Sequence, residues 1–96
     1  MKITGYEESR ERCAESGWFA YDILLEEPLT REDIVLFRPL GGFLFLSMLK
    51  QPFFKVEQDS FVIKGVQGNA HFRLAMHQDE CEKIEEWIER FRCLGE

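Results

Sequence analysis

The 96-residue chain carries 18 acidic and 12 basic side chains, and its net charge of −6 argues against binding to nucleic acids or to anionic membranes, which rely on clustered basic residues. Hydrophobic residues make up 45% and charged residues 31% of the chain, a balance typical of globular proteins, and the length predicts one domain over residues 1–96. The N-terminus lacks the apolar core of a secretory signal and the 3 cysteines include no CxxC pair, so we expect a cytoplasmic protein with free thiols.

The N-terminal part of the chain predicts a helix followed by a strand. Residues 6–16 are mostly polar and precede a glycine, which favours a short surface helix, and residues 1–3 are either a short edge strand or disordered. Residues 18–26 alternate in the manner of a strand. Its more apolar face carries Phe19, Tyr21, Ile23 and Leu25.

The middle of the chain predicts a β-hairpin. Thr30 and Asp33 have the spacing of a helix cap and would start a helical turn, but we favour a loop that leads into a strand over residues 34–38. Residues 39–42, with the sequence PLGG, are typical of a turn. We expect this turn to join the strand to a second one within the apolar run of residues 43–49.

The C-terminal half predicts three short strands and one long helix. Residues 53–57, 61–66 and 72–76 have strand patterns, and the loops between them are too short for parallel crossovers, so they form an antiparallel meander. Residues 79–94 predict an amphipathic helix, with Asp79 and Glu82 as its capping box. Its apolar stripe comprises Cys81, Ile84, Trp87, Ile88, Phe91 and Leu94.

These elements together predict the α+β class. We expect an antiparallel sheet of five to six strands, arranged as a meander or roll, with the C-terminal amphipathic helix packed on it. Strands that follow one another before the final helix exclude a doubly wound parallel sheet, in which strands and helices alternate.

The apolar run over residues 43–49 is the feature with the clearest functional meaning. Such a run is either a central strand covered on both faces or an edge strand that meets another chain. We favour the central strand, because an exposed apolar edge invites aggregation. In the alternative, Phe43, Phe45 and Met48 would form an interface with another protein or with a second copy.

Chemistry-bearing residues are few. His77 and Cys81 are four residues apart and are the best reactive pair available, but two ligands are too few for a metal site, and no orienting group accompanies them. His71 would lie on the same strand as His77, roughly 20 Å away. The sequence predicts no metal site and no cofactor, and it specifies no small-molecule ligand.

Three functional hypotheses remain. The leading one is a binding or interaction module without catalytic activity, either homodimeric or bound to another protein. The second is a small enzyme that uses His71, or His77 with Cys81. The third is a regulatory domain that responds through the thiol of Cys81 or Cys13.

Overall fold

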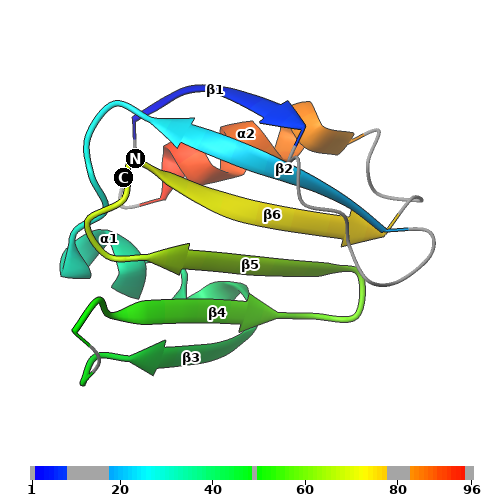
Figure 1. The fold of residues 1–96 in the computed structure, drawn as a ribbon. Coiled ribbons are helices and arrows are strands. Elements are labelled where there is room, and N and C mark those ends of the chain that lie inside the picture. Colours follow the sequence, from blue (N-terminus) through cyan, green and yellow to red (C-terminus); the bar gives the residue numbers. More distant parts are fainter. Residues whose placement is uncertain (1, 9–17, 49, 78–82, 95–96) are drawn as a thin grey trace.

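The computed structural model describes residues 2–8, 18–48, 50–77 and 83–94, and these form a six-stranded antiparallel sheet with helices on one side (Figure 1). The strand order is β1-β2-β6-β5-β4-β3. The strands are β1 (Ile3–Glu8), β2 (Trp18–Leu25), β3 (Gly42–Leu46), β4 (Phe53–Glu57), β5 (Phe61–Val66) and β6 (His71–His77). The helices are α1 (Arg31–Val35), the 3-10 helix η1 (Arg38–Leu40) and α2 (Ile84–Cys93). The predicted class, an antiparallel sheet with the C-terminal helix packed on it, is confirmed.

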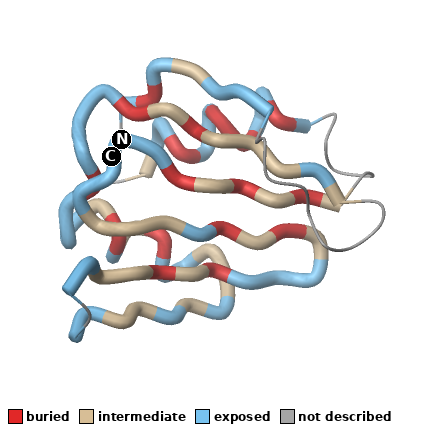
Figure 2. Tube along the Cα trace, in the orientation of Figure 1, coloured by how far each residue is buried: buried red, intermediate tan, exposed pale blue. Residues whose placement is uncertain are grey.

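The hydrophobic core lies between the sheet and the helices. Buried positions alternate with more exposed ones along β4, β5 and β6, so one face of each strand is apolar (Figure 2). The predicted stripe of α2 packs against this face through Ile84, Trp87, Ile88 and Phe91, all of which are buried. We call this side of the sheet the helix face. The predicted capping residues of α2, Asp79 and Glu82, lie outside the described residues.

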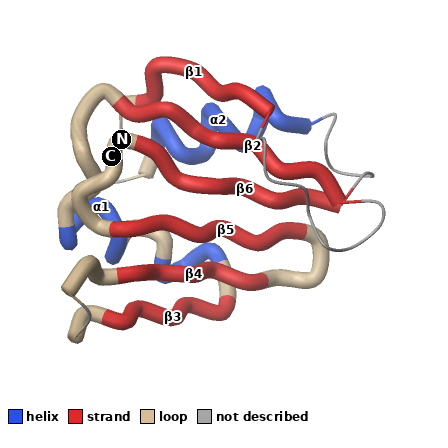
Figure 3. The backbone as a smooth tube through the Cα atoms, in the orientation of Figure 1, coloured by secondary structure: helices blue, strands red, loops and turns tan. Residues whose placement is uncertain are grey.

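The opposite side of the sheet carries the alternate side chains, and we call it the open face. The described helices all lie behind the sheet in Figure 3, so none of them covers this side. Alternation along the strands assigns the following side chains to the open face: Asp22, Leu44, Phe53, Lys55, Lys64, Val66, His71 and Arg73.

Strand β2 enters the sheet beside β6, although the two are far apart in sequence. Their antiparallel register runs from Trp18 opposite His77 to Leu24 opposite His71. The chain that leaves β2 is held against the β5–β6 turn by two backbone hydrogen bonds of Leu29. Its N–H donates to the Asn69 carbonyl, and its carbonyl accepts from the Gly68 N–H, both at 2.9 Å. Gly68, in this turn, has a φ of 95°, a conformation that glycine adopts without steric penalty.

The predicted helix over residues 6–16 is wrong at its start, because residues up to Glu8 continue the edge strand β1. The remainder of that prediction lies outside the described residues. An edge strand has few buried positions, and in β1 only Ile3 is buried, so its sequence is as polar as that of a surface helix. These residues form a strand because they pair with β2, and a local sequence pattern does not encode that pairing.

The predicted strand over residues 34–38, and with it the hairpin across residues 39–42, is also wrong. The alternative helical turn forms instead, because Thr30 and Asp33 make a capping box in which each side chain accepts the other's backbone amide, at 3.2 and 3.0 Å. Ile34 and Phe37, three residues apart, are then buried on one side of the turn. Residues of the predicted turn form η1, which leads directly into β3.

The apolar run over residues 43–49 contributes β3 at the outer edge of the sheet, so the favoured interpretation as a central strand is wrong. The strand ends at Leu46, and Ser47 and Met48 form a turn. The three predicted strands that follow are confirmed as β4, β5 and β6, the last being one residue longer at each end.

Candidate functional site

Strand β3 has an unusual composition for the edge of a sheet. Its sequence, GFLFL, contains no charged or polar side chain, and within the described ranges it pairs on one side only, with β4. Proteins normally protect such edges with lysine, proline or a bulge. No position of β3 is buried (Figure 2), so its side chains remain available for contact with another molecule.

The three residues predicted as an interface lie close to this edge but differ in their surroundings. Phe43 and Phe45 point to the helix face, where their ring centroids are 6.3 Å apart, and both are half-buried against the core of their own chain. Met48, in the turn after β3, is 81% exposed. Leu44 lies between the two phenylalanines on the open face and is 48% exposed. Leu44 was not among the predicted interface residues, because in an all-apolar strand the sequence does not show which of the two alternating sets of side chains faces the core.

The histidines predicted as reactive residues lie at opposite ends of β6. His77 is half-buried, and its ring packs perpendicular to that of Trp18 with centroids 6.0 Å apart. Its predicted partner Cys81 lies outside the described residues, as does Cys13. His71 is exposed at the start of the strand. The His77–Cys81 pair therefore stays a prediction.

Metal-binding and thiol chemistry gain no specific support from the described residues. Among them, no group of three or more histidine, cysteine, aspartate or glutamate side chains is arranged to hold an ion. Cys93, near the end of α2, is an exposed free thiol.

A shallow depression lies on the open face, and sequence analysis did not predict it. Its volume is about 460 Å³, and it extends from β1 over β2, β6 and β5 to the start of β4. Residues on its lining include Glu7, Asp22, Phe53, Lys64, Val66, Asn69, His71 and Arg73. The cations of this set come from two strands, and only the β5–β6 register brings them together.

A row of charged residues crosses the open face through this depression. The registers place Glu7 opposite Asp22, Asp22 opposite Arg73, Arg73 opposite Lys64, and Lys64 opposite Lys55. The row thus changes from acidic on β1 and β2 to basic on β6, β5 and β4. Lys55 forms an ion pair with Glu57 at 3.1 Å, whereas Lys64 lies between two other cations.

Comparison with known proteins adds no functional information. No protein-family model, curated protein or solved structure matches the chain. Within the part of the chain that the structure describes, no helix is both long and apolar enough to cross a bilayer. The function must therefore be inferred from the surfaces of the molecule itself.

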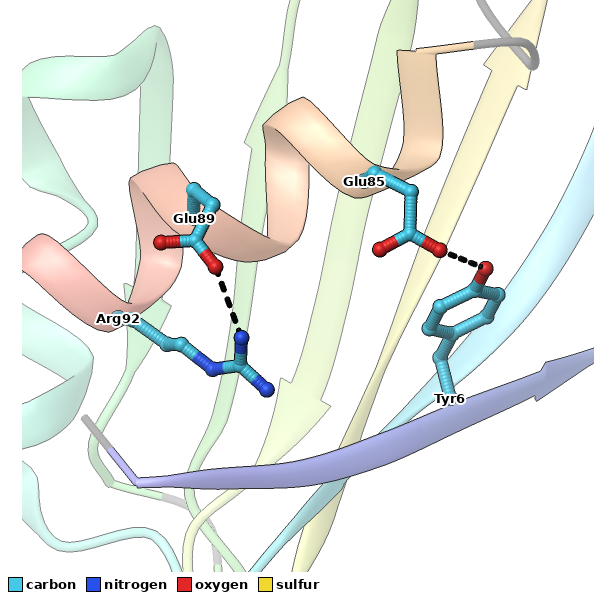
Figure 4. A network of polar contacts seen from close by, with 4 residues as sticks. All are labelled: Tyr6, Glu85, Glu89 and Arg92. Carbon is cyan, nitrogen blue, oxygen red and sulfur yellow. Dashed lines mark hydrogen bonds and ion pairs between the residues drawn. The ribbon is translucent and has the colours of Figure 1, made fainter.

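A hydrogen bond joins β1 to α2 on the helix face (Figure 4). The Tyr6 hydroxyl donates a hydrogen bond to the Glu85 carboxylate at 2.6 Å, and the Tyr6 ring packs edge-to-face on Tyr21. The hydrogen bond, together with the negative charge of Glu85, raises the pKa of Tyr6 above its ordinary 10.0. One turn further along α2, Arg92 pairs with Glu89 at 2.8 Å. This network joins β1 to the helix and has no evident role in a reaction.

Proposed function

We propose that the chain is a cytoplasmic protein–protein interaction module without catalytic activity, which forms a weak homodimer by pairing β3 with β3 of a second copy. The observation that carries the proposal is the position of an entirely apolar strand at the outer edge of the sheet. Its outward backbone groups are suited to main-chain hydrogen bonds with an added strand. The alternatives with a histidine or thiol site lack a comparable feature among the described residues.

A second copy suits this edge because β3 is complementary to itself. Antiparallel pairing about Leu44 sets the two Leu44 side chains opposite each other on the open face and sets Phe43 of one copy against Phe45 of the other. Cross-strand aromatic pairs typically contribute about 0.5–1.5 kcal/mol beyond their buried area. Since Gly42–Leu46 carries no charge, this symmetric pairing places no like charges opposite each other within the strand.

The length of β3 limits the affinity of such a dimer. A five-residue strand is about 17 Å long, and two such strands with their side chains bury less than the roughly 1,200–2,000 Å² of a standard stable interface. We therefore expect a dissociation constant on the order of 100 µM, which corresponds to about 5.5 kcal/mol of binding free energy. The dimer would be populated when the local concentration is high.

Two measurements test the dimer. Sedimentation equilibrium from about 10 to 1,000 µM should show reversible association around the expected dissociation constant. Hydrogen exchange over the same range should show that the amides of β3 become protected as concentration rises, while those of the central strands β5 and β6 do not change. A sharp monomer throughout the range, or β3 protection that does not depend on concentration, would refute the proposal.

A matched pair of variants locates the contact. Leu44→Lys places two like charges opposite each other on the symmetry axis and should abolish association without unfolding the monomer, because Leu44 is 48% exposed. Val35→Lys is the control, since Val35 is similarly exposed, at 46%, but lies on α1. Equal loss of association in both variants would show that general charge, rather than the β3 edge, governs the dimer.

A further inference from the structure

We propose that the depression on the open face binds a small organic oxyanion, with its carboxylate or phosphate group held by Lys64, Arg73 and His71 and its apolar part against Phe53. The polar groups of this site lie on β5, on β6 and in the turn between them, and only Phe53, on β4, lies next to β3. It would make the protein a ligand-binding module in addition to an interaction module.

The charge distribution is the first support. The chain has a net charge of −6, yet the exposed Lys64 has a cation on each side. Arg73 lies opposite it on β6, and Lys55 lies opposite it on β4. His71 lies diagonal to Lys64, two residues from Arg73 on the same face. Like charges in directly opposed positions destabilise a sheet. Because Lys55 is paired with Glu57, the repulsion that a bound anion would relieve is that between Lys64 and Arg73. Lysine and arginine donors make the strongest hydrogen bonds to such groups.

The surroundings of these cations are the second support. Phe53 and Val66 lie directly opposite each other and give the depression an apolar wall, against which a flat hydrocarbon group could pack. Asn69 offers an amide at the rim. The turn that carries Asn69 is held by two backbone hydrogen bonds to Leu29, so this side of the site is positioned before a ligand arrives.

The acids at the other end of the depression restrict the orientation of a ligand. Asp22 and Glu7 lie beyond Arg73 and would repel a negative group. The oxyanion is therefore directed towards Lys64. This gradient of charge excludes ligands with negative groups at both ends, and it tolerates a cationic or neutral end near Asp22.

Titration of the ¹⁵N-labelled protein with simple probes tests the site. Phenyl phosphate and benzoate carry an oxyanion and a ring, and we expect one or both to cause saturable shifts of the amides of residues 64–73, reduced by added salt. The tighter of the two identifies the oxyanion class. Inorganic phosphate lacks the ring and should bind more weakly than phenyl phosphate. Shifts that do not saturate, or that centre elsewhere, would overturn the proposal, and equal binding of inorganic and phenyl phosphate would overturn the assignment to an organic ligand.

Lys64→Gln removes the central cation from an exposed position and should weaken binding of the probe at least tenfold, as expected for the loss of a charge-assisted hydrogen bond. Arg92→Gln is the control, because it makes the same change in net charge on α2, on the helix side of the sheet. Unchanged affinity in Lys64→Gln, or an equal loss in both variants, would overturn the site. Both variants remain informative if the β3 dimer proves absent.

Discussion

Phe37 is the residue whose replacement tests the tertiary structure most directly. Its side chain is fully buried, and its ring lies 5.0 Å from that of Phe54, 5.1 Å from that of Phe72 and 6.0 Å from that of Phe91. It therefore joins the segment between α1 and η1 to two strands of the sheet and to α2. Phe37→Ala removes all three ring contacts at once.

The expected loss follows from these contacts. Truncation of a fully buried phenylalanine to alanine typically costs about 3–5 kcal/mol, through lost transfer free energy and the cavity left behind. The surrounding rings belong to three different elements and cannot easily collapse into the space, so we expect about 4 kcal/mol. That is a large part of the roughly 5–15 kcal/mol that stabilises a domain of this kind, and it corresponds to a fall in Tm of roughly 15–30 °C.

Urea unfolding followed by circular dichroism measures this loss. The midpoint should fall while the dependence of the unfolding free energy on urea stays close to that of the wild type, because the fold is retained. Val35→Ala is the control, since Val35 lies two residues before Phe37, at the end of α1, and is 46% exposed; the free energy of unfolding of this variant should differ from that of the wild type by about 0.5 kcal/mol or less. Phe37→Leu should give an intermediate loss, which keeps the comparison measurable if Phe37→Ala is too unstable to purify.

A loss below about 1.5 kcal/mol for Phe37→Ala would refute this reasoning, since it is less than the burial of the ring alone contributes. Such a result would mean that residues 34–38 do not dock in the core.

Two further predictions concern other contacts of the sheet. Gly65→Ala should destabilise the protein by about 1–3 kcal/mol, because a methyl group there would clash with the ring of the buried Phe54. Gly5→Ala, with nothing within 4 Å, is its control, and equal stability of the two variants in thermal unfolding would contradict the prediction. Tyr6 has a pKa raised above 10.0 by its hydrogen bond to Glu85, so this contact should stabilise the fold below pH 10.0 and be lost as pH rises through the raised pKa. In an absorbance titration of tyrosinate, Glu85→Gln should lower the pKa of Tyr6, and an unchanged titration curve would show that the hydrogen bond is not formed in solution.

The candidate surfaces illustrate how far local sequence information extends. The apolar run containing Phe43 and Phe45 is visible in the sequence, but its position at the edge of the sheet and the exposure of Leu44 depend on pairing with β4. No local motif marks the depression, because Lys64 and Arg73 are nine residues apart and come together only through the β5–β6 register. A search for like charges at equal distances from the β5–β6 turn could have found this pair.

The sequence by itself determined the elements whose patterns are strong and local. The alternation in β4, β5 and β6 and the 3.6-residue periodicity of α2 predict their structures, because one face of each must be buried. Only the tertiary structure decided that residues from Ile3 to Glu8 form a strand, that the chain from Arg31 to Leu40 forms α1 and η1, and that β3 is an edge. The physical reason is that strand order and register arise from long-range pairing. Weakly patterned segments adopt the conformation that fills the remaining core or completes the sheet.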